Sequence, residues 1–481
     1  MIPMHLDDTI VAIATPAGRG GIGVVRLSGT EARSIVRPML RLAHNHELEP
    51  GRAHFGELID PATGERIDDV VATFFAKPHS YTTDDVVEIS CHGSPVVLRH
   101  VVEMALAAGA RLAEPGEFTM RAFLNGRIDL TQAEAVRDLI DSQTLYQAQV
   151  AARQLGGALS QRLQPVKNEL IQLIAALEAG VDFAEDDVAV MPGDQILARI
   201  AAIRVPLDEL LATFAYGKVV HEGLTLAIVG RPNVGKSSLF NRLVERERAI
   251  VTATPGTTRD LVTETVAIGG IPVRLVDTAG IRSALDEAES IGVRKSMETL
   301  ADADLVLIVF DTSSGAATAV STDERYHEER LLQRLSERRA IIVCNKIDIR
   351  GANRHGPPSN DEEYLRRVSG PAWAGMHPVV MTSALTGAGM AELRSTILKL
   401  IGGEASVQQE SGFLTNVRQK RLVTEAIAAL ERATDAVPVR IPHEMILLDL
   451  YSALRPLDDI TGATTADDIL NLIFSSFCIG K

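Results

Sequence analysis

An apolar run, LTLAIV, leads straight into the segment GRPNVGKS (230–237), and this junction limits the possible folds more than any other stretch of the sequence. The pattern is that of a P-loop, in which a strand ends in a glycine-rich turn and a helix begins. Glycines let backbone N–H groups curl around phosphate oxygens, and the helix N-terminus adds positive potential. Lys236 is placed to reach the β- and γ-phosphates, and the Ser237 hydroxyl to bind Mg²⁺. The junction therefore predicts a nucleotide-binding α/β domain.

Four further motifs complete the pattern of a GTP site. They are GTTRD (256–260), DTAG (277–280), NKID (345–348) and SAL (383–385). Asp277 ends an apolar run, where a carboxylate can support the Mg²⁺ shell, and Asp348 can accept two hydrogen bonds from guanine that adenine does not offer. Backbone amides of SAL can reach the guanine carbonyl, and the threonines of GTTRD fall in the switch that closes over the metal. Five motifs in this order predict a GTP-binding domain.

The hydrolysis chemistry differs from that of Ras-like enzymes, which orient the attacking water with a glutamine directly after DTAG. This chain has Ile281 there, and an apolar side chain cannot polarise water. Hydrolysis therefore needs another polar group, and another cation where an arginine finger would act. The candidates in the next segment are Arg282, Asp286, Glu287 and Glu289. Spacing alone leaves open that each of them is only a solvated charge on a switch loop.

The pattern of apolar and strand-forming residues along the chain predicts a multidomain α/β plus α protein. Strand-like runs at 9–29, 68–78 and 85–93 and one helix-like stretch at about 95–109 predict an N-terminal α+β domain at residues 1–127. Apolar residues at steps of three and four predict long amphipathic helices of a bundle at 128–222. One such series is Leu163, Val166, Leu170, Leu173, Ile174 and Leu177. Strands alternate with helices at 223–402, which predicts a mostly parallel sheet with one antiparallel hairpin at its Gly-Gly turn. The sequence pattern at 403–481 again predicts helices, so we expect the Ras-like P-loop domain to be inserted into a helical domain.

Composition excludes several classes of protein. A length of 481 residues allows about three domains. The net charge of −15 argues against a protein that coats nucleic acid by bulk attraction, so any RNA contact is local or shared with a partner. The cysteines Cys91, Cys344 and Cys478 are too scattered for a disulfide framework or a zinc site. No signal peptide and no long apolar run are evident, so we expect a cytoplasmic protein without membrane contact.

The motifs together resemble one family, the MnmE (TrmE) tRNA-modification GTPases, over nearly the whole chain. The segment DTIVAIATPAGRGGIGVVRLSG (8–29) resembles the family's N-terminal opening, and PGEFTMRAFLNGRIDLTQAEAVRDLI (115–140) resembles its signature at the entry to the helical domain. The motifs GRPNVGKSSLFN, TPGTTRD and DTAGIR and the tail FCIGK are similar to the family's as well. Other P-loop GTPases share the nucleotide motifs but not the N-terminal signatures or the tail.

The resemblance implies that K⁺-dependent dimerisation activates the GTP-binding domain, with the ion replacing an arginine finger. Asn233 matches the family's K⁺-binding asparagine. The switch loop would complete the K⁺ site with Thr252, Thr254 and Thr257. The family's water-positioning glutamate falls at Glu289, which makes it the first catalytic candidate beside Lys236 and leaves Arg282 without a role.

The motifs and the resemblance together predict the contacts of the nucleotide and its metal. Mg²⁺ is expected at Ser237 and Thr258. The predicted GTP contacts are Asn233, Gly235, Lys236, Ser237, Ser238, Thr252, Thr257, Thr258, Asp277, Gly280, Asn345, Lys346, Asp348, Ser383 and Ala384.

The resemblance also implies a folate site in a constitutively dimeric N-terminal domain. By motif position, the contacts to a 5-formyl-tetrahydrofolate type of cofactor fall at Arg26, Glu88, Arg127 and Lys481. A glutamate suits the donor edge of a pterin, and basic groups suit the anionic tail. The family often has lysine where this chain has Arg127, so the charge is kept while the geometry changes to a planar fork.

The implied activity needs a second protein. With a flavoprotein of the MnmG (GidA) type, in a heterotetramer, such a GTPase would add an aminomethyl-type (carboxymethylaminomethyl) group to the wobble uridine of certain tRNAs. The partner would bind FAD and NADH, and it would also make most of the contacts to tRNA. Two alternatives are a ribosome-assembly GTPase, although neither a second P-loop nor a KH-like clamp is evident, and a nucleotide-controlled scaffold with little turnover.

The C-terminal tail FCIGK (477–481) has the placement of a prenylation box, but Gly480 and Lys481 do not suit one. The run DDILNLIFSSF before it is typical of a helix with one apolar face, which would direct the tail toward the protein interior. We therefore favour docking of the tail toward the folate site, with Cys478 shaping that pocket, over a catalytic thiol. No role is predicted for the insertion at 351–372.

Overall fold

The computed structural model describes residues 7–43, 47–182, 191–231, 233–244, 263–277, 303–312, 338–349, 377–401, 412–439, 441–463 and 480. Packing divides the chain into two units. The first holds residues 1–137, 152–200 and 428–481, and the second holds 138–151 and 201–427. This division cuts through helices, whereas the four-part division expected from the sequence falls between them and stays a prediction.

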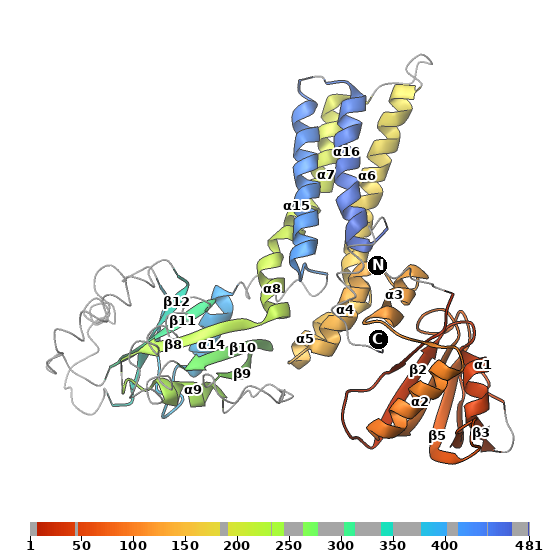
Figure 1. Ribbon diagram of the computed structural model, residues 1–481. Coiled ribbons are helices and arrows are strands. Elements are labelled where there is room, and N and C mark those ends of the chain that lie inside the picture. The colour runs from red at the N-terminus through yellow and green to blue at the C-terminus, as the bar shows by residue number, and fades with distance from the viewer. Residues whose placement is uncertain are drawn as a thin grey trace, which may run out of the picture. The chain divides into compact units, whose positions relative to one another are not determined.

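A seven-stranded sheet forms the N-terminal part of the first unit (Figure 1). Its strands, in spatial order, are β3 (Leu40–Leu42), β4 (Ala53–Ile59), β5 (Arg66–Phe75), β6 (Val86–His92), β2 (Ile22–Ser28), β1 (Ile10–Ile13) and β7 (Arg111–Leu112). All neighbours pair antiparallel except β1 and β7. The predicted strands at 9–29, 68–78 and 85–93 are confirmed, while β3, β4 and β7 were not predicted.

Alternating side chains give this sheet a buried face, against which helices pack. The helices are α1 (Ala32–Val36), the short 3₁₀ turn Arg37–Met39, and α2 (Pro95–Ala107), which was predicted as a helix. Val25, Leu27 and Ile89 from the strands form one core cluster with Leu98 and Val101 of α2. The N-terminal part is therefore α+β, as expected.

A buried ionic network anchors α3 (Glu117–Leu124) to the start of β1. Glu117 and Arg121 are each 1% exposed. Arg111 joins Glu117 at 2.6 Å and Asp8 at 2.7 Å, and Arg121 joins Asp8 at 2.5 Å. Burial alone would raise the pKa of Asp8, but its hydrogen bonds to Arg111 and Arg121 and their positive charge hold it below its ordinary value.

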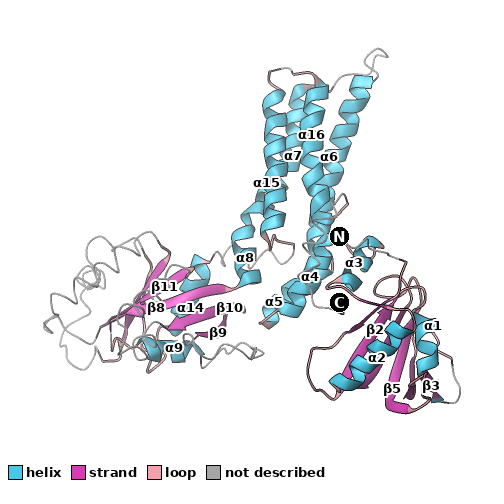
Figure 2. Ribbon diagram, viewed as in Figure 1, coloured by secondary structure: helices cyan, strands magenta, loops and turns pink. Residues whose placement is uncertain are grey.

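The helical portion of the first unit packs α6 (Ala158–Asp182) against α16 (His443–Thr461) (Figure 2). Two polar contacts support this apolar seam. Lys167 reaches Asp458 at 2.6 Å, and the Tyr451 hydroxyl donates to Glu178 at 2.6 Å. The residues predicted to line the seam from α6 are all buried: Leu163, Val166, Leu170, Leu173, Ile174 and Leu177. The prediction of a long amphipathic helix is confirmed for α6.

Helices α4 (Leu130–Asp141), α5 (Leu145–Leu155), α7 (Gly193–Ala212) and α15 (Val417–Ala436) each run across the division between the units. Among the described residues of the second unit, the other helices are α8 (Phe214–Glu222), α9 (Lys236–Val244) and α14 (Met390–Leu400).

The second unit contains the predicted α/β sheet. Its strands, in spatial order, are β13 (Val379–Met381), β12 (Ala340–Asn345), β11 (Leu305–Asp311), β8 (Leu224–Gly230), β10 (Ile271–Asp277) and β9 (Thr263–Ile268). All pairs are parallel except the β9–β10 hairpin at the sheet edge, whose turn is Gly269-Gly270. A mostly parallel sheet with one antiparallel edge hairpin was predicted for the Ras-like P-loop domain, and the structure confirms it.

Residues at the start of α5 and just before it hold the turn of that hairpin. The Thr144 hydroxyl donates to the Gly270 carbonyl at 2.5 Å, and Tyr146 packs so closely on Gly270 that an added Cβ would lie 2.6 Å from the Tyr146 Cβ. The hydroxyls of Tyr146 and Tyr216 lie 2.8 Å apart. The edge hairpin and the start of α5 therefore form one packed structure within the second unit.

No helix in the described portion of the chain is long and apolar enough to cross a membrane.

We predict that Asp8→Asn lowers the free energy of unfolding by about 1–3 kcal/mol at neutral pH, because the buried Arg121 guanidinium loses the negative charge of its carboxylate partner. Asp8 has a lowered pKa when folded, so its contribution is present above the unfolded value of about 3.9 and is lost as pH falls through the folded value. The variant should thus lose less stability between neutral and acidic pH than the wild type. Urea unfolding at several pH values measures this, and parallel pH curves for the two proteins contradict it.

Candidate functional site

The turn after β8 has the backbone of a phosphate-binding loop. Gly235 has φ +94°, and a Cβ there would lie 2.3 Å from the Asn345 side-chain nitrogen, so only glycine fits. The ammonium of Lys236 donates to the carbonyls of Gly230 at 2.9 Å and Arg231 at 2.7 Å. Lys236 is 8% exposed at the start of α9, and its charge lies against the loop whose N–H groups would receive phosphates.

Asn345, at the end of β12, joins three of the predicted motifs. Its side chain is 1% exposed. The amide nitrogen donates to the carbonyl of Val234 in the P-loop at 3.0 Å, and the amide oxygen accepts from the backbone N–H of Ala384 at 3.1 Å. One buried amide thus fixes the P-loop against the NKID and SAL segments.

Lys346 is held in place by two acceptors. Its ammonium donates to the Asn233 carbonyl at 2.7 Å and to the Asp311 carboxylate at 2.6 Å. Lys346 and Asn233 both have left-handed backbones, with φ of 66° and 65°. Asp311 was not predicted as a site residue, although its position at the end of β11, beside two motif-bearing strands, could have indicated it.

The predicted guanine contacts also come together. The Ser383 hydroxyl donates to the Asp348 carboxylate at 2.5 Å and accepts from the Thr386 N–H at 3.1 Å. Ser383 is fully buried, while Asp348 is exposed. Because the serine fixes one carboxylate oxygen, the carboxylate has a defined orientation toward solvent and any base that lies there.

Several predicted site residues lie outside the described residues. They are Thr252, Thr254, Thr257, Thr258, Gly280, Arg282, Asp286, Glu287, Glu289, Cys478 and Lys481. Asp277 ends β10, but its side chain is also outside the description. Ser237 and Ser238 are exposed in the first turn of α9, where hydroxyl groups can reach a metal or a phosphate. In the described part of the chain, acidic, histidine and cysteine side chains form no group suited to a metal.

A second site gathers cations in the N-terminal part of the first unit. Arg26 and Glu88 face each other on β2 and β6, and their side chains meet at 2.7 Å. The pair is partly exposed, at 19% and 28%. Arg26 also donates to the carbonyl of Gly480 at 3.4 Å, so the end of the chain lies beside the predicted folate contacts. Gly480 has φ +100°, and a Cβ would lie 2.4 Å from the Ile13 carbonyl.

Two guanidinium groups lie over one aromatic ring in this site. Arg26 and Arg127 are 5.8 Å and 5.7 Å from the ring centre of Tyr81, and Arg26 is 5.7 Å from that of Phe118. The Tyr81 hydroxyl lies 2.9 Å from the Thr119 hydroxyl. Burial raises the pKa of Tyr81, so the ring stays neutral. Sequence reasoning named Arg26, Glu88 and Arg127 but missed the aromatic ring between them.

The two described cysteines, Cys91 and Cys344, are buried. Burial, and then the charge of Asp68, raise the pKa of Cys91 to about 12, so its thiol stays protonated.

Family models match most of the chain. The model described as the MnmE helical domain matches residues 130–478, and the one described as the GTP-binding protein TrmE N-terminus matches residues 9–127.

Proteins named tRNA modification GTPase MnmE are similar over their full length. The one from Koribacter versatilis (strain Ellin345) is 67% identical over 479 residues, which cover 99% of this chain and 100% of that protein. The one from Aquifex aeolicus (strain VF5) is 43% identical over 477 residues, with the same coverage. Among solved structures, the G domain of the T. maritima FeoB iron transporter is 27% identical and covers 37% of this chain and 97% of its own, with a TM-score of 0.26.

We predict that Asp348→Asn weakens GTP binding and shifts preference toward xanthosine triphosphate, because an amide can donate to the oxygen that replaces the guanine 2-amino group. The loss of one charge-assisted contact corresponds to about tenfold or more in affinity. Competition between the two nucleotides, measured by equilibrium binding, tests this. Retained guanine preference would refute the role of Asp348. Asp304→Asn is a matched control, because Asp304 lies just before β11, at the amino ends of the parallel strands, whereas Asp348 follows the carboxyl end of β12.

Proposed function

The chain belongs to the MnmE family of tRNA modification GTPases, and we propose that its GTP hydrolysis drives addition of an aminomethyl-type (carboxymethylaminomethyl) group to the wobble uridine of certain tRNAs. It is a GTP hydrolase that acts in tRNA modification. One observation carries the enzymatic part: the buried amide of Asn345 ties together the P-loop, NKID and SAL segments, which is the construction of a guanine nucleotide site.

The residues around the P-loop fit a nucleotide with its metal ions. Ser237 and Thr258 would hold Mg²⁺, which neutralises charge on the phosphates. The glycine cradle at Gly235 leaves space that a side chain would fill, and Lys236 already lies against the loop.

We assign K⁺ to the P-loop and the switch. The ligands would be Asn233 with Thr252, Thr254 and Thr257. Asn233 is exposed, and its backbone carbonyl already serves Lys346, which leaves the side-chain oxygen to act as a ligand. Glu289 would orient the attacking water, since Ile281 cannot.

A folate one-carbon donor of the 5-formyl-tetrahydrofolate type fits the second site. Arg26 and Arg127 lie over the Tyr81 ring, and Glu88 pairs with Arg26. Arg26 also donates to the carbonyl of Gly480, the residue before Lys481 in the sequence. Aromatic and cationic groups together suit a flat ring with an anionic tail. The chemistry such a donor supplies is transfer of one carbon.

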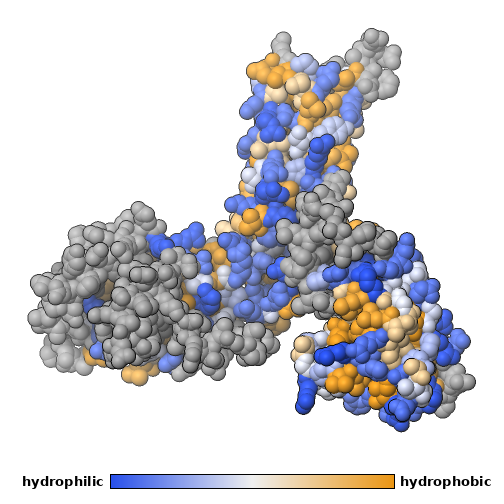
Figure 3. Space-filling model, in the orientation of Figure 1, coloured by the Kyte–Doolittle hydropathy of each residue, from blue (hydrophilic) through white to orange (hydrophobic). Residues whose placement is uncertain are grey.

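The partners we propose are a second copy of the chain, a flavoprotein of the MnmG (GidA) type in a heterotetramer, and tRNA shared with that flavoprotein. Exposed apolar side chains on the N-terminal part support a homodimer there (Figure 3). They are Ile22, Phe55, Val71, Val96, Leu106 and Leu112.

The domain roles we propose follow the sequence. Residues 1–127 would dimerise and bind folate, 223–402 would bind GTP, and 128–222 with 403–481 would form the helical domain. A cytoplasmic location suits such an enzyme.

Glu289→Ala should leave GTP affinity nearly unchanged while slowing hydrolysis by two or more orders of magnitude, as expected for loss of a residue that acts on the attacking water. Single-turnover hydrolysis in K⁺ buffer, beside nucleotide binding, measures both quantities. The same assay in Na⁺ buffer should be slow for the wild type. A near-normal rate for the variant would return the role to Asp286, Glu287 or Arg282.

The tRNA assignment is tested in a strain that lacks this gene. The intact chain should restore the modified wobble uridine, measured by mass spectrometry of tRNA nucleosides. A chain without its last four residues should hydrolyse GTP normally yet restore no modification, because the tail beside Arg26 is lost. Persistent modification in the deletion strain would favour a ribosome-assembly GTPase or a scaffold instead.

A further inference from the structure

An open pocket of about 490 Å³ lies in the N-terminal part, and Arg127 belongs to its lining. Its lining residues are Pro78, His79, Thr83, Asn125, Gly126 and Arg127. This volume is within the range of about 300–1,000 Å³ that holds small molecules.

Contacts among the described residues link the pocket to the site around Tyr81. Glu88 forms an ion pair with Arg26. The guanidinium groups of Arg26 and Arg127 both lie over the ring of Tyr81. Arg127 in turn lines the pocket. The series therefore runs from a carboxylate, across an aromatic ring, to a pocket with a cationic wall.

Hydrogen bonds fix the walls of the pocket. The Asn125 amide donates to the Thr82 carbonyl at 2.7 Å and to Asp84 at 3.3 Å. The Ser80 hydroxyl donates to the Asp84 carbonyl. The loop that carries His79 is thus bound to the end of α3, so the pocket exists before any ligand arrives.

The charge of the pocket lining is basic. No carboxylate among the described residues pairs with Arg127, and both Arg127 and His79 are exposed. A guanidinium and an imidazole at one pocket suit carboxylates, which they bind with charge-assisted hydrogen bonds.

We propose that this pocket receives the γ-linked glutamate chain of a polyglutamylated folate, with His79 and Arg127 binding its carboxylates. The proposal rests on the folate site proposed above. If the pterin lies at Glu88 and the ring system against Tyr81, the tail leaves the ring at Arg127 and enters the pocket. The pocket would then select folates that carry several glutamates.

The test compares 5-formyl-tetrahydrofolate with one and with three glutamates, titrated into the purified full-length chain by calorimetry. The triglutamate should bind about tenfold more tightly, as expected for one additional charge-assisted contact. His79→Ala should remove most of that advantage while changing the monoglutamate affinity less than twofold. His79→Lys should keep the advantage.

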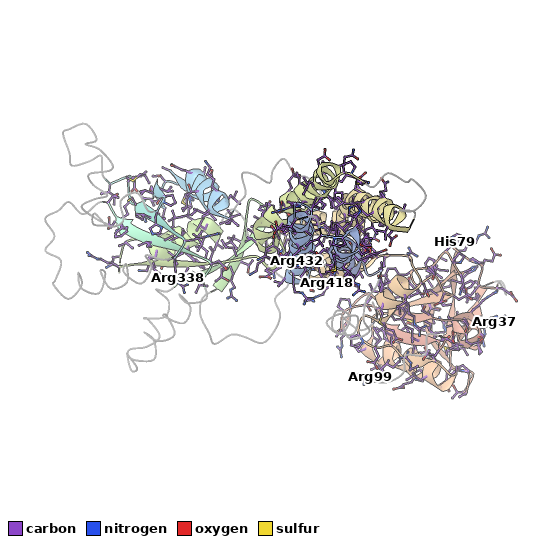
Figure 4. The ribbon with its side chains drawn as sticks, turned by 90° about the horizontal axis from the view of Figure 1, so that it is seen from above. Arg37, His79, Arg99, Arg338, Arg418 and Arg432 are labelled. Atoms are coloured by element: carbon purple, nitrogen blue, oxygen red, sulfur yellow. The ribbon has the colours of Figure 1, made fainter. Side chains whose placement is uncertain are left out.

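Arg99→Ala is the matched control, because Arg99 is an exposed cation on α2 that lies well apart from His79 (Figure 4). It should bind both folates as the wild type does. The GTP hydrolysis rate of each variant shows that the protein is folded.

Each outcome separates the two ideas. Equal affinities for the two folates, or an advantage that survives His79→Ala, overturn the pocket assignment and leave the folate site intact. Failure of the wild type to bind either folate overturns the folate site itself, and the pocket assignment with it. Binding of free triglutamate alone with similar affinity would show a general carboxylate site rather than a folate subsite.

Discussion

The nucleotide site depends on one buried side chain, the amide of Asn345. A buried amide that lost its partners would cost about 1–3 kcal/mol for each unsatisfied group, so its bonds to Val234 and Ala384 hold the three segments together. The absence of a Cβ at Gly235 is what lets the amide approach the loop. A larger residue at Gly235 would therefore separate the P-loop from the base-recognition strands as well as crowd the phosphates.

The second site follows a different physical principle. Arg26 and Arg127 carry like charges, which repel each other. The face of the Tyr81 ring stabilises both guanidinium groups, and Glu88 neutralises the charge of Arg26. The aromatic ring stays uncharged because burial disfavours its ionisation. A site with two cations and one carboxylate keeps a net positive charge in a protein whose overall charge is −15, and anions are attracted locally rather than by the whole molecule.

Local patterns predicted the parts of the fold that depend on chain neighbours. Apolar strands lead into the P-loop, DTAG, NKID and SAL motifs as expected. The Gly-Gly hairpin and the amphipathic repeat of α6 were also found where expected. Residues brought in by distant strands were missed. Asp311 reaches Lys346 only because β11 lies between β8 and β12, and Tyr81 lies beside Arg26 and Arg127 only through tertiary packing. Neither placement has a signature at a fixed sequence spacing.

The edge hairpin is the place where the nucleotide domain and helical residues share one structure. Strand β9 begins just after the predicted switch segment that contains Thr257 and Thr258, and β10 ends at Asp277 of DTAG. The turn between these strands is bonded to Thr144 and packed against Tyr146. Paired strands move together, because sliding one past the other breaks several ladder hydrogen bonds. A shift at either strand end must therefore move the start of α5 or break its bond to the turn.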